Sequence, residues 1–346
     1  MTESKSLNRR ALLRGAGVAA IATPALVGKG IAQGKATWRV QSHWPKSSSS
    51  FEGSLGVIAN RLEEKTDGAF KLELFGAGEF AKGPDIFNIV RKGVVSMGSI
   101  AASYIQDHAQ TANFVYGIPG TFRESWEFQH ATKNMGLEAL INEELAEDGI
   151  LLMADKVLPV EMVLKKKIES ADDFRGVKIR SSGAMLDYLQ AAGAAPQFIP
   201  GSEMYQALAS GVLDGAHWGA AVGAKSMSLW EVCPYHYKPP LGFTTDSFIF
   251  NMSELDKLDP ELRDVLLETV DVRFYQRSAE YQLGEVVALQ SGITENDLQV
   301  MTLPDDVLEI LAAASTKILE TEGAKGEYAA KAKDIYLSMM GDLGYV

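Results

Sequence analysis

Strand-like and helix-like patterns alternate along this chain from Ala36 onward, and that alternation is the strongest constraint on its fold. Alternating or continuous apolar runs predict strands, while apolar residues three and four positions apart predict helices. A regular succession of the two is typical of an α/β fold. In the first half we predict strands over 37–42, 70–75, 94–100 and 150–154, and helices over 51–62, 85–91 and 124–148.

The second half repeats this pattern and ends in helices. Asp259-Pro260-Glu261 is a strong helix start, with a capping carboxylate, a proline at the first helical position and an acid in the first turn. The helix continues to about Gln290, interrupted only by Gly284, and would extend roughly 45 Å. Because that exceeds one small lobe, we expect it to lie across two. The other predicted elements are strands over 161–164, 177–180, 197–199 and 248–252, and helices over 185–192, 202–210, 304–320 and 326–340.

The first 32 residues have the features of an export signal. Arg9 and Arg10 precede an apolar stretch that ends near Val27, and Gly30-Ile31-Ala32 supplies small residues for signal peptidase. This segment resembles a twin-arginine signal and predicts a periplasmic protein. It is too short for a stable transmembrane span, which needs about 20 apolar residues.

Composition and motifs exclude several functions. A net charge of −12 over 346 residues argues against binding to nucleic acid, whose phosphates require clustered lysines and arginines. The five histidines show no zinc spacing, and the single cysteine, Cys233, has no internal disulfide partner. The chain lacks a phosphate loop and a Gly-x-Ser-x-Gly elbow, and its Gly76-Ala77-Gly78 does not complete a dinucleotide motif. We therefore predict no enzymatic activity and no cofactor.

Arg180 is the foremost candidate for binding a ligand. It ends the predicted strand 177–180, and the carboxyl ends of strands face the ligand crevice in α/β lobes. A guanidinium there can hold a carboxylate through two parallel hydrogen bonds, which lysine cannot do. An ordinary salt bridge at a strand end is the alternative.

Aromatic residues also stand at predicted strand ends. Trp218 follows the short strand after Gly215 and could cover the apolar part of a small ligand, with His217 beside it. Trp44 ends the first strand and could face Trp218 across a cleft. A place in the hydrophobic core is the alternative for Trp218.

Four further residues are candidates, and three of them, Phe243, Thr245 and Asp246, lie at a predicted crossing between lobes. Phe243 and Thr245 precede a late strand, and Asp246 could hold a metal cation or cap a turn. Glu161 could be a metal ligand, an acceptor for ligand hydroxyls or an exposed acid.

Three blocks in this order resemble the solute-binding subunits of tripartite ATP-independent periplasmic (TRAP) transporters. They are residues 171–180 (ADDFRGVKIR), 200–208 (PGSEMYQAL) and 211–215 (GVLDG). The resemblance implies a two-lobed periplasmic-binding-protein fold, similar to type II, with a long helix spanning both lobes. It implies residues 33–157 and 246–285 for lobe I, 158–245 and 286–315 for lobe II, and 316–346 as a C-terminal helical segment.

The resemblance also implies function. Arg180 matches the carboxylate-binding arginine of the family, and Trp218 matches a ligand-facing position. The chain is then a non-enzymatic receptor that closes on a small organic carboxylate, a 2-oxo or 2-hydroxy monocarboxylic acid, and delivers it to TRAP membrane subunits. Aromatic or hydrophobic acids would also fit, and sugar acids, dicarboxylates or a secreted enzyme are the alternatives.

Two features of the resemblance stay open. In members that bind 2-oxo acids, an acid that helps to hold a metal ion precedes the tryptophan. His217 stands there in this chain and weakens a metal-bridged mode of binding, although a bound metal ion remains an alternative. The final helices could support a homodimer or cap a lobe.

Overall fold

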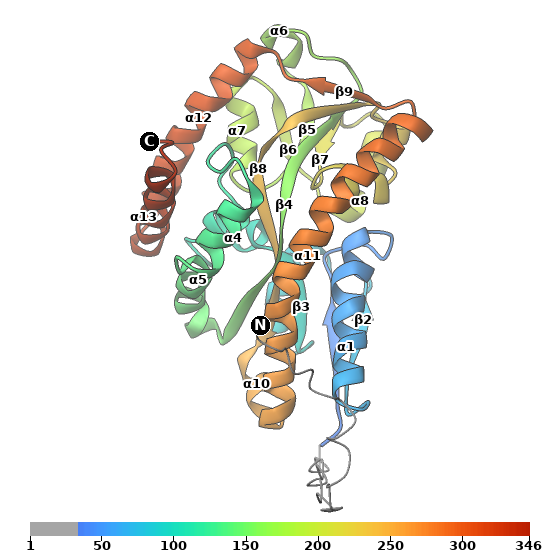
Figure 1. Cartoon of the computed structure of the whole chain (residues 1–346), viewed down its shortest axis with the longest axis vertical. Coiled ribbons are helices and arrows are strands. Elements are labelled where there is room, and N and C mark those ends of the chain that lie inside the picture. Colours follow the sequence, from blue (N-terminus) through green and yellow to red (C-terminus); the bar gives the residue numbers. More distant parts are fainter. Residues whose placement is uncertain (1–33) are drawn as a thin grey trace, which may run out of the picture. The chain divides into compact units, whose positions relative to one another are not determined.

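A computed structural model describes residues 34–346, so the predicted twin-arginine signal lies outside the described residues. Within this range one mixed sheet has the strand order β2-β1-β3-β8-β4-β7-β5-β6, and β9 pairs with β8 (Figure 1). The strands are β1 (Ala36–Gln41), β2 (Phe70–Phe75), β3 (Met97–Ala101), β4 (Ile150–Leu164), β5 (Lys178–Ser181), β6 (Ala195–Phe198), β7 (Gly215–His217), β8 (Tyr235–Asn251) and β9 (Gln299–Thr302).

Helices cover this sheet and confirm the α/β class that the alternating pattern predicts. A π-helical turn over Phe51–Gly56 leads into the first helix. The helices are α1 (Val57–Lys65), α2 (Ile86–Arg91), α3 (Ala112–Tyr116), α4 (Ser125–Lys133), α5 (Leu137–Leu145), α6 (Ala171–Phe174), α7 (Met185–Ala191), α8 (Gly201–Ala209), α9 (Ala221–Ser226), α10 (Met252–Lys257), α11 (Pro260–Glu295), α12 (Asp305–Gly323) and α13 (Glu327–Asp342).

Two long antiparallel strands, β4 and β8, join the two halves of the sheet. One end of the pair lies beside β3, β1 and β2, and the other end lies beside β7, β5 and β6. Strands predicted separately over 150–154 and 161–164 are thus one strand. The ladder continues through the polar pair Asp155-Lys156 and Pro159, with register shifts at 154/156 and 160/162. The predicted lobe boundaries at 157/158 and 245/246 fall inside β4 and β8, and they stay a prediction.

The long helix α11 connects two separate hydrophobic clusters. Its first half packs Leu262, Leu266 and Val270 with side chains of β1, β2 and α1. Its second half packs Ala288 with side chains of α8 and α9. The helix has 36 residues, about 54 Å, and runs lengthwise past β4 in Figure 1. The predicted spanning helix is confirmed, and it extends five residues beyond the predicted end.

The helix predicted over 124–148 is instead two helices, α4 and α5. The chain breaks at Gly136, whose φ of +91° lies in the left-handed region that glycine adopts without strain. The final helices pack on their own chain, α12 against α7 and α13 against α3, α4 and α5. Tyr336 of α13 is fully buried and donates a hydrogen bond of 2.7 Å to the carbonyl oxygen of Phe114. The apolar faces of these helices are thereby covered within one copy.

None of the helices between residues 34 and 346 is both long enough and apolar enough to cross a bilayer.

Gly117 provides a test of how the helices are held against β8. Its φ is +119°, and an added Cβ would lie 2.1 Å from the carbonyl oxygen of Phe243. We expect Gly117→Ala to lower the free energy of unfolding by at least about 2 kcal/mol, because strain and overlap add. Gly341→Ala in α13, where no atom lies within 4 Å, is the control and should change it by less than about 1 kcal/mol. Equal urea denaturation curves for the two variants would contradict this packing.

Candidate functional site

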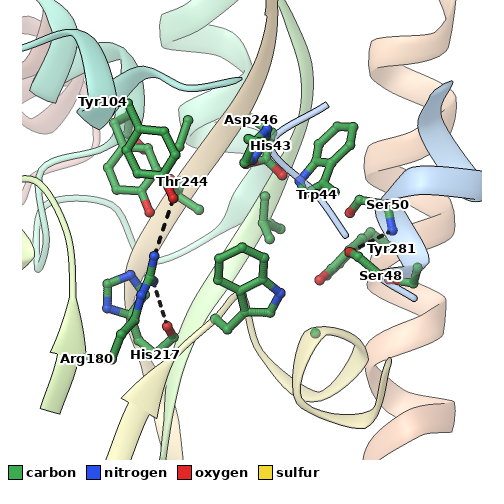
Figure 2. Close-up of a pocket in the computed structure, with 17 residues that line it drawn as sticks. His43, Trp44, Ser48, Ser50, Tyr104, Arg180, His217, Thr244, Asp246 and Tyr281 are labelled. Atoms are coloured by element: carbon green, nitrogen blue, oxygen red, sulfur yellow. Dashed lines mark hydrogen bonds and ion pairs between the residues drawn. The ribbon is translucent and has the colours of Figure 1, made fainter. Parts of the chain in front are cut away.

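A pocket opens beside the middle of the β4–β8 pair, and both halves of the sheet contribute to it. The empty space in it is about 470 Å³ when the part open to solvent is included. Figure 2 shows Arg180 and His217 on one side and Trp44, Ser50 and Tyr281 on the other. The lining also includes His43, Ser48, Ser49, Tyr104, Tyr116, Leu158, Trp218, Thr244 and Asp246.

Arg180 is a buried cation without an acidic partner. It lies in β5, where its backbone pairs with β6 and β7, and only 1% of its surface is exposed. Its Nε donates to the carbonyl oxygen of Ile199 at 2.9 Å, and Nη1 donates to that of His217 at 3.0 Å. Nη2 lies 3.5 Å from the hydroxyl of Tyr104, and no carboxylate of the described residues forms an ion pair with the guanidinium. A guanidinium has five N–H groups, so at least two remain for a ligand.

Neutral polar groups surround this cation. The Nδ1 of His217 lies 3.0 Å from the hydroxyl of Ser181, while its buried Nε2 has no partner. Burial, and then the charge of Arg180, lower the pKa of His217 well below its usual value, so the imidazole is neutral. Burial raises the pKa of Tyr104 to about 12, although Arg180 opposes this, so the phenol keeps its proton. The site therefore offers one positive charge and several neutral hydrogen-bonding groups.

A second cation, Lys156, is fully neutralised by neighbouring acids. Its ammonium lies 2.8 Å from Asp155 and 2.7 Å from Asp246, with no exposed surface. The same Nζ is 4.6 Å from the ring centroid of Trp44. Burial acts to raise the pKa of Asp246, but the charge of Lys156 and the hydrogen bond from His43 outweigh it and hold that pKa far below its usual value. Asp246 is an ionised, paired carboxylate.

The described residues do not fit a metal ion. No group of three or more histidine, cysteine, aspartate or glutamate side chains among residues 34–346 could hold one. The ammonium of Lys156 already occupies the space between Asp155 and Asp246. The metal role predicted for Asp246 therefore has no further ligands to support it, and it stays a prediction.

The structure brings together four of the predicted ligand-binding residues and displaces three others. Arg180, His217, Trp218 and Trp44 all line the pocket. Trp218 also stacks near the guanidinium, whose Cζ is 5.0 Å from the ring centroid. The displaced residues are Glu161, Phe243 and Thr245.

Phe243 and Thr245 are displaced by one residue. Side chains alternate between the two faces of a strand, so Thr244 and Asp246 face the pocket from β8 while Phe243 and Thr245 do not. The hydroxyl of Thr245 instead donates to the carbonyl oxygen of Val115 at 2.7 Å.

Glu161 serves a different contact. Its buried carboxylate lies 2.6 Å from Nε2 of His236 and also pairs with Lys238, and it is absent from the pocket lining. The position of Glu161 therefore supports neither a contact with a ligand in the pocket nor a contact with a metal ion.

Several lining residues were not predicted from the sequence. Tyr104 comes from a 3-10 helix (Ala102–Ile105), Tyr116 from the short helix α3 and Tyr281 from the long helix α11, and no local pattern connects them. The serines at 48–50 begin four residues after Trp44, so their run was a usable signal.

Most of the described range resembles known solute-binding proteins. Residues 41–325 match the family model described as DctP, bacterial extracellular solute-binding protein, family 7. The chain is 27% identical to the monocarboxylate 2-oxoacid-binding periplasmic protein of Nostoc sp., over 66% of this chain and 63% of that relative, just under two thirds of its length.

Two solved structures share the fold. A TRAP transporter solute-binding protein of Bordetella bronchiseptica, with copurified calcium and picolinate, has a TM-score of 0.83 at 21% identity, covering 90% of this chain and 94% of that one. One from Pseudoalteromonas atlantica, with bound sodium and pyruvate, has a TM-score of 0.82 at 22% identity, covering 90% and 95%. At these identities the likeness establishes the fold alone.

Lys156 is expected to be a structural cation of the site. Replacing it in Lys156→Met leaves Asp155 and Asp246 buried without a counter-charge, so the free energy of unfolding should fall by about 3–5 kcal/mol. Adding Asp246→Asn in the same chain removes one orphaned charge and should restore part of the loss. Urea denaturation at pH 7 measures both, and a loss below about 1 kcal/mol in the single variant would contradict the pairing.

Proposed function

This chain belongs to the DctP family of bacterial extracellular solute-binding proteins, family 7, and we propose that it captures a small organic monocarboxylate. The observation that carries the proposal is the buried guanidinium of Arg180, which has no acidic partner among the described residues. An uncompensated buried charge is unfavourable by several kcal/mol, so the site gains most from an anion. A carboxylate can satisfy the free N–H groups in bidentate geometry.

A single carboxylate suits the charges of the pocket. Arg180 is the one lining residue of the described range with a permanent positive charge, and Asp246 adds a negative charge nearby. A dicarboxylate or sugar acid would require a second cation, and Lys156 is already neutralised. This balance favours a monocarboxylate over both alternatives.

The neutral groups favour an oxygen at carbon 2 of that acid. The unpartnered Nε2 of His217 can donate to a 2-oxo group or accept from a 2-hydroxyl group, depending on its tautomer. Tyr104 supplies a further hydroxyl beside Arg180. Trp218 and Trp44 can cover an apolar or aromatic remainder. The 2-oxoacid-binding relative from Nostoc supports the same class of ligand.

Binding without chemistry is the proposed outcome. Acyl or group transfer requires a nucleophile that is paired with an activating base, and no nucleophile that lines the pocket has such a partner. The neutral His217 is hydrogen-bonded to Ser181, but Ser181 does not line the pocket. A secreted enzyme is the competing class. Recovery of the ligand unchanged after incubation with the protein would separate the two.

Capture would couple to transport through closure of two lobes. Closure around the ligand desolvates the Arg180–carboxylate pair and strengthens it. A ligand that binds the closed form better shifts the population toward that form, which TRAP membrane subunits would recognise. We place this exchange in the periplasm, reached through the twin-arginine signal of residues 1–32.

A thermal-shift screen of monocarboxylates tests the proposal. A true ligand at 100 times its dissociation constant should stabilise the protein by about 2.7 kcal/mol, with EDTA present because the proposed mode uses no metal. Arg180→Met should weaken binding by about 2–5 kcal/mol, roughly 30-fold or more. Arg175→Met, an exposed arginine of the same segment, is the matched control and should bind normally. Full affinity of Arg180→Met for every hit would refute the site.

His217 should discriminate among acids of the same length. We expect His217→Leu to lose about 1–2 kcal/mol for pyruvate and little for propionate, because only pyruvate has the 2-oxo oxygen. Because the pKa of His217 lies well below its usual value, wild-type affinity should be equal at pH 5.5 and 7.5. An imidazole of ordinary pKa would become cationic as the pH falls and would bind the anion more tightly. Calorimetry that shows such tightening would contradict the neutral imidazole.

A further inference from the structure

Two of the described residues that line the pocket have a buried side-chain atom without a hydrogen-bond partner. One atom is Nε2 of His217, beside Arg180, and the other is the hydroxyl oxygen of Ser49. Ser49 precedes Ser50, which Figure 2 shows with Tyr281 on the side of the pocket opposite Arg180. This side is called the far wall here and consists of the serines at 48–50 and Tyr281. Because an unpaired polar atom is unfavourable when buried, the far wall also gains from a ligand group that pairs with it.

The backbone around Ser49 is held in place by two arginines of α11. Nη2 of Arg277 donates to the carbonyl oxygen of Ser49 at 3.4 Å, and Nη2 of Arg273 donates to that of Gly53 at 2.7 Å. Gly53 has no room for a side chain, since an added Cβ would lie 2.8 Å from Cζ of Arg277. These contacts fix the backbone of the segment and leave the hydroxyl of Ser49 available to a ligand.

Tyr281 adds a second hydroxyl to the far wall. An added Cβ at Gly219, another lining residue, would lie 2.9 Å from this hydroxyl, so the phenol oxygen is at the pocket surface. Burial, above all, raises the pKa of Tyr281 well above its usual value, so the phenol keeps its proton and can donate.

A positive charge lies behind the far wall. Cζ of Arg277 is 5.3 Å from the ring centroid of Tyr281, and the same guanidinium holds the backbone of Ser49. Arg273 and Arg277 share the single carboxylate of Glu280, so the three side chains have a formal charge of +1. A cation behind a hydroxyl favours the orientation in which its oxygen faces the cation and its hydrogen faces the pocket. The far wall therefore favours a hydrogen-bond acceptor.

A second carboxylate is not the acceptor that these charges favour. Lys156 and its two acids, Asp155 and Asp246, have a formal charge of −1, and the ammonium lies 5.7 Å from the ring centroid of Tyr281. This negative charge offsets the positive charge behind the far wall. A neutral oxygen gains the hydrogen bonds of the hydroxyls without bringing a further negative charge near Asp246.

We propose that Ser49 and Tyr281 form a subsite for a neutral oxygen, so that the ligand is a monocarboxylate with an ether, carbonyl or hydroxyl oxygen at the end remote from its acid group. This inference rests on the proposed capture of a monocarboxylate by Arg180 and adds a requirement at the opposite end of the ligand. Trp44 and Trp218 would cover the apolar middle. An acid without the distal oxygen leaves the hydroxyl of Ser49 unpaired, and a site built to form a hydrogen bond discriminates against such an analogue.

Calorimetry with matched pairs of 2-oxo acids tests the subsite. In each pair one methylene near the end of a straight chain is replaced by an ether oxygen, as in 2-oxoheptanoate and 5-methoxy-2-oxopentanoate, and the series is extended one carbon at a time. At the length that fits best, the ether acid should bind at least about tenfold more tightly than its alkyl partner. Equal affinities at every length would overturn the subsite alone, whereas failure of every acid to bind would refute monocarboxylate capture itself.

A terminal carboxylate tests whether the far group is neutral. The 2-oxo dicarboxylate of matching length should bind more weakly than the ether acid, because its second charge lies near Asp246. Tighter binding of the dicarboxylate would show that the far wall selects an anion and would overturn the proposal.

Ser49→Ala and Tyr281→Phe test the two hydroxyls separately. Each variant should bind the ether acid more weakly, Ser49→Ala by about tenfold, and should bind the alkyl acid as the wild type does. Ser47→Ala is the matched control, because Ser47 belongs to the same run of serines but is exposed and does not line the pocket. It should leave both affinities unchanged. A Ser49→Ala variant that keeps the preference for the ether acid, or that loses both acids equally, would contradict the proposed contact.

Discussion

The antiparallel pairing of β4 with β8 is the constraint on which the rest of the structure depends. These two strands run through both halves of the sheet, so each half is attached to the same ladder. The register shift at 154/156 falls at Asp155 and Lys156, and Lys156 pairs with Asp155 and with Asp246 of β8, which lines the pocket. A β-bulge disrupts a hydrogen-bond ladder locally. In this protein the bulge in the β4–β8 ladder positions charged groups beside the candidate site.

Two buried cations near the pocket have opposite roles because their partners differ. Lys156 has two acids within 2.8 Å and contributes to the stability of the site. Arg180 has backbone carbonyls and a distant phenol, which satisfy N–H groups without cancelling the charge. The electrostatic potential that remains is therefore positive only near Arg180. It favours a ligand with an anionic group at one end, while the other end can be apolar. The same helix that lines the pocket with Tyr281 presents Leu283 to solvent.

Strand geometry explains why only some of the site residues predicted from the sequence line the pocket. Arg180, Trp218 and Trp44 each lie near a strand end that hydrophobic patterning could locate. Phe243 and Thr245 lie one position away from the lining residues Thr244 and Asp246, because a segment of mixed polarity does not reveal which alternate residues face inward. Glu161 was identified as a functional acid, but its pairing with His236 and Lys238 depends on the β4–β8 register, which no local pattern encodes.

The sequence by itself determined the α/β class, the long helix and the family, since these depend on periodicity, caps and short motifs that act over neighbouring residues. Two other features were decided only by the packing of the chain. Residues 150–164 form one continuous strand and not two, and the helix predicted over 124–148 breaks at Gly136. Tertiary structure alone decided that Lys156 is neutralised while Arg180 is not, because ion pairing depends on distances between residues up to 90 positions apart. It also decided that one face of α11 remains uncovered, since periodicity describes a helix but not what packs against it.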